Sequence, residues 1–466
     1  MTTLTLARGG ALTLALATIA LTPAAAQKET PPPGSAPKPF TLPEGKRYEL
    51  PNGMQVTLVP YGVQPMVAAQ LVIRVGNVHE GPEEVWLADL AGDMLREGTA
   101  TRDAAQLAAE VAAMGGQLGI GTGMDQTNIG ADVLTEFGPR LVAVIADVAR
   151  NPAFPATELP RLKANRLRQL AVAKTQPQQI TLDEFRKAVY PDHPYGRIFP
   201  TEAMINGYTV DALKAFHARH YGAGRAHLYV AGRFDLAAME RAIADAFGGW
   251  ARGTDASAPL PSPVAAKDVR VLDRKGAAQS TIYLGLPVPN PSSSDWVPLT
   301  VANTLLGGYF GSRITANIRE DKGYTYSPFS TLSSRYRDTY WAQVADVTTS
   351  VTGASLKEIY HEIDRLRTEA PPADELQGVQ NYLSGTFVLQ NSNRFGIIGQ
   401  SNFLDLHGLP RSYLSEYVQK VHAVTPAEVQ RMARQYLDPM KMLLVVTGER
   451  SVIDEQLAPY RGATPD

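Results

Sequence analysis

Apolar positions along the chain recur at spacings of two and of three to four, which predicts strands and helices in turn. Tyr48–Val59 is expected to form a hairpin, because Pro51-Asn52-Gly53 in its middle tolerates the positive φ of a tight turn. Glu84–Glu97 has helical spacing and places Trp86, Leu87, Leu90, Met94 and Leu95 on one face. Further elements predicted in the first half are a strand over Gln70–Val75, a helix over Arg102–Met114 capped by Thr101, strands within 118–133, and helices over about 136–150 and 157–174.

Two segments far apart in the chain share one pattern. Thr209–Asp235 and Thr425–Glu449 each contain a capped helix, a tyrosine near its end, a short turn and an apolar strand that ends in glycine. The tyrosine and the glycine are eleven positions apart in the first segment and twelve in the second. A repeat at this distance predicts the duplication of an α+β unit of about 200 residues.

Proline-rich stretches divide the chain. Residues 27–45 hold six prolines, which exclude a helix or a central strand, so we expect a tether there. A second stretch, rich in proline, serine, glycine and alanine, runs from Gly253 to Ala266 and indicates a linker over 253–267. The predicted domains are therefore 46–252 and 268–466.

The first 26 residues have the composition of a secretory signal. Arg8 is their only charged residue, an apolar run follows from Ala11 to Leu21, and Ala24–Ala26 offers small residues for cleavage. The apolar run is shorter than the roughly 20 residues of a membrane-spanning helix, so cleavage is favoured over anchoring. The expected location is a bacterial periplasm, with no transmembrane segment left after cleavage.

Composition narrows the chemistry that the chain can perform. It contains no cysteine, which excludes disulfides, thiolate catalysis, cysteine metal sites and a cysteine-linked lipid anchor. The net charge of −2 gives no reason to expect nucleic acid as a partner. With 44% hydrophobic and 19% charged residues, the chain has the composition of a globular protein with a sizeable core.

One helical segment resembles a zinc-binding signature. Arg74–Thr99 reads RVGNVHEGPEEVWLADLAGDMLREGT. It resembles the pitrilysin/insulinase (inverzincin) family of zinc metallopeptidases, in which this helix carries His-x-x-Glu-His between similar flanks. The two histidine positions hold Asp89 and Asp93 here, and the glutamate position holds Gly92. The family's third ligand, a glutamate on a later helix, falls on Gln169.

The replaced positions remove the chemistry of the signature. Histidines at i and i+4 share a helix face and can hold one Zn²⁺, while the glutamate activates the bound water. Because two ligands, the base and the third ligand are all replaced, we expect no zinc in this chain. Asp89 and Asp93 could still contribute to a Ca²⁺ or Mg²⁺ site, but a solvated or hydrogen-bonded helix face is the favoured alternative.

Other motifs carry less weight. Asp192–Arg197 also resembles a loop of the family, and His193 within it is expected to be structural. His217 and His220 lie three positions apart on a helix, but ordinary helix residues are the favoured interpretation. The glycine-rich loop over 307–311 lacks the Gly-Lys-Ser/Thr of a phosphate-binding loop.

The second half carries the positive signal. Leu306–Ser327 reads LGGYFGSRITANIREDKGYTYS and resembles the family's carboxy-terminal segment. In active members, an arginine and a tyrosine seven positions apart reach the substrate, and Arg319 and Tyr326 match that spacing. The alternative is a surface ion pair of Arg319 with Glu320 or Asp321 and a half-buried Tyr326. With the flanks intact, we expect Arg319 and Tyr326 to bind substrate.

The resemblance covers about residues 46–460 and implies an α+β fold. Two homologous α/β-sandwich halves of the metallopeptidase (LuxS/insulinase-like) type would form a half-shell. The predicted function is that of a non-catalytic subunit of a heterodimeric periplasmic zinc metallopeptidase. The Zn would lie in a homologous partner subunit with His-x-x-Glu-His, and this chain would help to bind the peptide substrate. The alternative is a non-enzymatic peptide-binding or scaffold protein of the same fold. An active peptidase with another site finds no support, because neither Gly-x-Ser-x-Gly nor a histidine cluster occurs.

Overall fold

The computed structural model describes residue 43 and residues 45–461. The expected signal over 1–26 lies outside these residues, and so does the expected tether apart from residues 43 and 45. Within the described part of the chain, no helix has both the length and the apolarity that crossing a bilayer requires.

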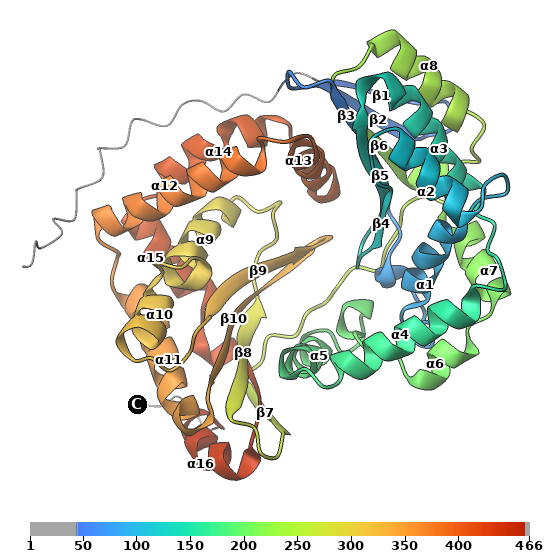
Figure 1. Ribbon diagram of the computed structural model, residues 1–466. Coiled ribbons are helices and arrows are strands. Elements are labelled where there is room, and N and C mark those ends of the chain that lie inside the picture. The colour runs from blue at the N-terminus through green and yellow to red at the C-terminus, as the bar shows by residue number, and fades with distance from the viewer. Residues whose placement is uncertain (1–42, 44, 462–466) are drawn as a thin grey trace, which may run out of the picture. The chain divides into compact units, whose positions relative to one another are not determined.

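The first half of the chain forms a six-stranded sheet with the strand order β1-β2-β6-β3-β5-β4 (Figure 1). Its strands are β1 (Lys46–Glu49), β2 (Gln55–Pro60), β3 (Met66–Ile73), β4 (Gly119–Thr122), β5 (Thr127–Leu134) and β6 (Ala226–Gly232). β2 and β6 run parallel, and the other neighbouring pairs are antiparallel. The predicted hairpin is confirmed as β1 and β2, which turn at Gly53 with a φ of 90°.

The first half of the chain also forms helices. They are α1 (Leu87–Met94), α2 (Ala104–Ala113), α3 (Gly138–Arg150), α4 (Leu159–Ala173), α5 (Pro177–Val189), α6 (Glu202–Gly207), α7 (Val210–His220) and α8 (Leu236–Phe247). Apolar side chains of α1, α2, α3, α7 and α8 meet alternate strand residues in one core. Leu71 of β3 and Ile129 of β5 are fully buried there.

The start of α2 differs from the prediction. The helix begins at Ala104, and its cap is Asp103 rather than Thr101. The Asp103 carboxylate accepts a hydrogen bond from the backbone N–H of Gln106, and the Gln106 side chain accepts one from the Asp103 N–H. α1 also begins three residues later than predicted, because Trp86 directly before it has a left-handed φ of 70°.

The second half repeats this plan with five strands in the order β7-β11-β8-β10-β9. The strands are β7 (Asp268–Asp273), β8 (Gln279–Pro287), β9 (Phe329–Arg335), β10 (Asp338–Thr348) and β11 (Leu443–Gly448). The helices are α9 (Trp296–Asn303), α10 (Arg313–Thr315), α11 (Thr352–Thr368), α12 (Ala373–Gln390), α13 (Arg394–His407), α14 (Ser412–Ala423), α15 (Pro426–Tyr436) and α16 (Arg450–Arg461).

The two halves have the same topology. β7 pairs parallel with β11, and the pairs β11–β8, β8–β10 and β10–β9 are antiparallel, so these five strands correspond in order to β2, β6, β3, β5 and β4. The predicted repeat is confirmed in α7 with β6 and in α15 with β11. Thr209 and Thr425 cap the two helices by accepting a backbone hydrogen bond. The chain is therefore an α+β protein of two homologous halves.

Each half also supplies a helix to the sheet of the other half. α5 packs on β8 and β11, where the rings of Phe185 and Tyr340 lie 5.2 Å apart. Gly285 of β8 leaves room for this contact, since a Cβ there would lie 2.9 Å from the Phe185 ring. α13 packs on β3 and β6 through Ile397 and Ile398. Because β3 and β6 correspond to β8 and β11, the two contacts are equivalent.

Polar contacts fix α13 at both of its ends. The Arg394 guanidinium donates to both Asp132 carboxylate oxygens, at 2.9 and 2.6 Å. Near the other end, the Asp405 carboxylate accepts from the Tyr229 hydroxyl at 2.7 Å and from Arg47 at 2.6 Å. α13 is thus bound to the first sheet by charge-assisted contacts as well as by its apolar face.

Candidate functional site

The positions of the zinc signature surround an arginine. α1 presents Asp89 and Asp93 on one face, and α4 presents Gln169 toward them. Arg166 of α4 contacts all three: its Nε and Nη2 lie 2.7 and 2.6 Å from Asp93 Oδ2. Arg166 Nη1 lies 3.4 Å from Asp89 Oδ1 and 3.2 Å from Gln169 Oε1. A cation that belongs to the chain therefore lies among the three positions.

This arrangement does not fit a zinc ion. The donor set is two carboxylates and an amide, without histidine, and a guanidinium already neutralises charge among them. A metal ion there would meet the positive charge of Arg166 at short range. Among residues 43 and 45–461, no cluster of three or more His, Asp or Glu side chains is arranged to hold a metal ion.

The carboxylates are further bound by neighbouring groups. Asn77 Nδ2 donates to Asp89 Oδ2 at 2.6 Å and to Glu80 Oε1 at 3.1 Å. Glu80 also accepts from the Ala88 N–H at 2.8 Å, near the start of α1. Burial raises the pKa of Glu80 to about 8. Burial also raises the pKa of the Asp93 carboxyl, although the charge of Arg166 opposes that shift.

Position 92, where the signature has its catalytic glutamate, has no room for a side chain in this fold. A Cβ on Gly92 would lie 2.4 Å from Thr122 Oγ1, at the end of the edge strand β4. Glutamate could enter position 92 only if Thr122 moved, because real Cβ contacts are essentially never that short. The glycine therefore allows α1 to approach β4 closely.

Arg319 and Tyr326 form the second group of predicted residues. Arg319 lies in the π-helical turn Ala316–Asp321, and its Cζ lies 4.7 Å from the centre of the Tyr326 ring. Its Nε pairs with Glu320 at 2.9 Å, as the surface alternative expected. That alternative is wrong about Tyr326, which is 78% exposed rather than half buried. No hydrogen bond, ion pair or ring contact in the described part of the chain joins these two residues to the group around Arg166.

The donor groups of this pair remain available. Within residues 43 and 45–461, Arg319 makes its one ion pair through Nε, and neither its Nη groups nor the Tyr326 hydroxyl has a hydrogen-bond partner. Phe310 is a third member that the sequence did not point to, since its ring centre lies 4.3 Å from Arg319 Cζ. The three side chains form a cation–aromatic cluster in which both rings are exposed and the Arg319 side chain is 24% exposed. The cluster can donate hydrogen bonds to an acceptor.

The histidines that could have bound metal are structural. His193 Nδ1 accepts from the Tyr195 N–H at 3.2 Å, and its Nε2 lies 3.1 Å from the carbonyl oxygen of Pro259. His217 Nε2 lies 2.9 Å from the Ala149 carbonyl oxygen. These contacts bind loops and helices together. His220 is buried with its ring centre 5.4 Å from that of His79, and no group of three potential metal ligands occurs among the described residues.

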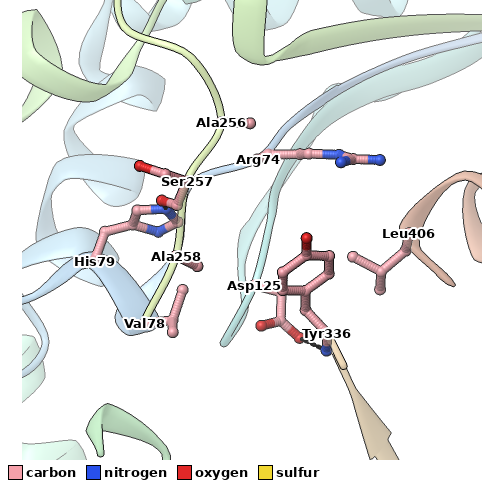
Figure 2. Close-up of a pocket in the computed structure, with 9 residues that line it drawn as sticks. All are labelled: Arg74, Val78, His79, Asp125, Ala256, Ser257, Ala258, Tyr336 and Leu406. Carbon is pink, nitrogen blue, oxygen red and sulfur yellow. Dashed lines mark hydrogen bonds between the residues drawn. The ribbon is translucent and has the colours of Figure 1, made fainter. Parts of the chain in front are cut away.

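A small pocket lies between the halves beside the segment 253–267 (Figure 2). It encloses about 310 Å³ including its mouth, and it is lined by Arg74, Val78, His79, Asp125, Ala256, Ser257, Ala258, Tyr336 and Leu406. Its polar groups are already paired: Asp125 accepts from the Tyr336 N–H at 3.2 Å and from the Tyr195 hydroxyl at 2.5 Å. Arg74 donates to the Asp405 carbonyl oxygen at 2.7 Å. The pocket therefore lies at the joint between the two halves.

A larger groove follows the face of the first sheet that is turned away from the core. It encloses about 1160 Å³ with its open side, and it is lined by Met66, Gln70, Arg96, Gly115, Gly116, Gln117, Gly119, Ile120, Gly121, Asn128, Gly130, Asp132 and Phe395. Glycines make its floor flat, and β4 at its side is an edge strand. An extended peptide can pair with such an edge through main-chain hydrogen bonds.

Fold and site together define a metallopeptidase-like protein in which an arginine lies among the positions of the zinc signature. The family model described as insulinase (peptidase family M16) matches residues 56–200, and the model described as peptidase M16 inactive domain matches residues 207–383. The chain belongs to this pitrilysin/insulinase family, as the signature segments indicated.

Known relatives carry related descriptions. The uncharacterized zinc protease YmxG of Bacillus subtilis is 26% identical over 393 residues, which are 84% of this chain and 95% of that protein. A solved structure described as a peptidase M16 inactive domain from Pseudomonas fluorescens has a TM-score of 0.81 at 24% identity, covering 87% of this chain and 98% of that one. A protease from Helicobacter pylori has a TM-score of 0.81 at 18% identity, covering 88% and 100%. The structural likenesses show a shared fold.

Proposed function

We propose that this chain is the non-catalytic subunit of a heterodimeric, periplasmic zinc metallopeptidase. Arg319 and Tyr326 bind the peptide substrate in an active site whose zinc is held by a homologous partner chain with His-x-x-Glu-His. One observation carries the proposal. Arg166 lies among the signature positions Asp89 and Asp93, whereas the Nη groups of Arg319 and the hydroxyl of the 78% exposed Tyr326 have no partner in the described chain.

Hydrolysis in such a complex depends on the partner's metal. When bound there, zinc supplies a metal-activated water for attack on the peptide carbonyl. In this chain α1 offers no imidazole, and Arg166 already forms ion pairs with Asp89 and Asp93. The task left to this chain is to bind and orient the substrate.

Arg319 and Tyr326 have the chemistry for that task. The two Nη groups of Arg319 form a planar donor fork that suits a carbonyl or carboxylate oxygen. The Tyr326 hydroxyl can donate to the oxygen that gains charge during attack on the carbonyl. Both side chains lie on one surface and are linked by the cation–aromatic contact at 4.7 Å. A substrate oxygen could therefore meet both donors at once.

The test reconstitutes the pair. This chain and a homologue that carries His-x-x-Glu-His are expressed separately and together, and peptide hydrolysis is measured for each preparation. Activity is expected only for the complex. Tyr326→Phe should lower turnover about 10²–10³-fold, as loss of an oxyanion donor does elsewhere, and Arg319→Ala should also lower kcat/KM.

Matched variants control for surface changes. Tyr382→Phe removes the hydroxyl of another exposed tyrosine, and Arg337→Ala removes an arginine that also stacks on a tyrosine ring, at 5.7 Å from Tyr336. Both should leave turnover unchanged. If Arg319→Ala and Tyr326→Phe complexes of normal size on size-exclusion chromatography have wild-type turnover, the shared active site is refuted. Hydrolysis by this chain alone would refute the non-catalytic role.

A second function is favoured by the groove beside β4. A non-enzymatic peptide-binding or scaffold protein of the same fold would use its glycine floor and edge strand to hold an extended peptide. In that case the chain alone should bind unstructured peptides, and Gly121→Val in the floor should weaken binding. Peptide binding without any activity in the reconstituted pair would favour this function over the first.

A further inference from the structure

Phe310 is an exposed aromatic residue with a specific contact. Its side chain is 64% exposed, although most large apolar residues of the second half lie in its core. The Phe310 ring centre lies 4.3 Å from Arg319 Cζ, which is closer than the Tyr326 ring at 4.7 Å. A cation over an aromatic face at this distance is attracted to the ring.

Glycines allow the loop that carries Phe310 to pack closely against its surroundings. A Cβ on Gly307 would lie 2.7 Å from Ser330 Oγ and 2.8 Å from Gln343 Oε1. A Cβ on Gly311 would lie 2.9 Å from the ring of Tyr309. The backbone at Gly307 and Gly311, on either side of Phe310, therefore packs directly against neighbouring side chains, which restricts the conformations of this loop. These glycines therefore allow close packing of the loop that carries Phe310.

Arginine in a binding site is effective only if its long side chain is held in place. A free arginine samples many rotamers, and ordering it on binding lowers affinity. Three groups restrain Arg319 here: the two rings, and Glu320, which accepts from Nε at 2.9 Å. The Nη edge remains without a partner in the described chain, so the restraints do not use the donors that would face a ligand.

We propose that Phe310 is a positioning residue, which holds the Arg319 guanidinium ready to bind a peptide oxygen. The inference rests on the proposed function, because it concerns the same substrate-binding surface. It adds a residue to which neither the spacing of Arg319 and Tyr326 nor the comparisons point. Tyr326 then has two roles, as donor and as second ring, whereas Phe310 has only the role of holding the arginine.

The test is a double-mutant cycle in the reconstituted pair. Phe310→Leu removes the aromatic face and should reduce kcat/KM about 2- to 5-fold, the size of an exposed cation–π contact. Phe310→Tyr keeps the ring and should retain wild-type activity. Combined with Arg319→Ala, Phe310→Leu should cause no further loss, because the residue that it positions is gone. Phe329→Leu is the matched control, since within the described chain the rings that contact Arg319 are those of Phe310 and Tyr326 and not that of the exposed Phe329.

The outcomes separate this inference from the proposed function. If Arg319→Ala has no effect, the proposed function fails. If Arg319→Ala lowers activity but Phe310→Leu does not, or if their losses multiply in the double variant, the positioning role fails alone. Loss of activity in both Phe310→Tyr and Phe310→Leu would also refute it. Size-exclusion chromatography and thermal melting of each variant confirm that the complex compared is folded.

Discussion

Replacement of Arg166 by methionine tests whether an internal cation has taken the zinc position. Methionine keeps most of the apolar stem and removes the guanidinium, so Asp93 loses contacts at 2.7 and 2.6 Å and Asp89 loses one at 3.4 Å. The two carboxylate side chains are 32% and 20% exposed, which places them between the surface and the core. Breaking a fully buried pair costs about 3–5 kcal/mol, and an exposed pair contributes about 0.5 kcal/mol. We therefore expect a loss of about 1–3 kcal/mol in the free energy of unfolding.

The loss should depend on pH in a defined direction. Burial already raises the pKa of Asp93, and Arg166 opposes this shift, so the variant should raise that pKa further. A carboxyl with a higher pKa in the folded state takes up a proton on folding. Its unfavourable contribution is absent at low pH and develops as the pH rises from the unfolded pKa through the folded one. Arg166→Met should thus be less destabilising at pH 4 than at pH 7.

Urea unfolding at the two pH values, followed by circular dichroism, measures both effects. Arg168→Met is the matched control, because this neighbouring arginine of α4 bonds to Asn165, outside the group around Arg166. Asp93→Asn combined with Arg166→Met should recover part of the loss, since one unpaired carboxylate is removed. If Arg166→Met unfolds like Arg168→Met at both pH values, Arg166 does not stabilise this position and the internal-cation argument is wrong.

Two further predictions concern the lost catalytic position. Gly92→Ala should lower the free energy of unfolding by about 1–3 kcal/mol through its clash with Thr122. Adding Thr122→Ala should restore the stability, because alanine suits a helix better than glycine by about 1 kcal/mol. Urea unfolding midpoints measure both effects, and a double variant as unstable as Gly92→Ala would contradict the steric cause. The purified chain should contain no stoichiometric zinc by elemental analysis, and histidines introduced at Asp89 and Asp93 should not create peptidase activity while the base is missing. One tightly held zinc per chain with chelator-sensitive hydrolysis would contradict that expectation.

The sequence predicted which positions of the zinc signature meet, but not what fills them. Asp89 and Asp93 share a face because they are four residues apart on one helix. Arg166 lies three residues before Gln169 on α4, so helical spacing alone could have brought it to the same place. The signature defines only the ligand and base positions, so it does not indicate Arg166. Thr122 could not be foreseen against Gly92, since that contact depends on how closely α1 approaches β4.

Most helices and strands lie where the pattern of apolar positions predicted them, and the errors in their ends have local causes. The cap of α2 was assigned to Thr101, although Asp103 and Gln106 form a capping box that the sequence contains. The sequence does not indicate the contact of Phe310 with Arg319, because a single residue in a loop has no periodicity. The exposure of Tyr326 was equally hidden. Apolar faces predicted helices and strands, whereas the choice of which sheet each helix covers depends on tertiary packing.

The exchange of α5 and α13 has a consequence for how such a chain could have arisen. A single ancestral half would carry one such helix and one sheet face that needs to be covered. In a domain-swapped dimer of two such halves, the helix of each copy would cover the sheet of the other copy. The present chain corresponds to that swapped dimer with its copies joined through 253–267. A half expressed alone would expose the sheet face that the other half's helix covers, and it should pair with itself or aggregate. A chain cut within 253–267 should instead stay together, because α5 and α13 would still bind the two pieces to each other.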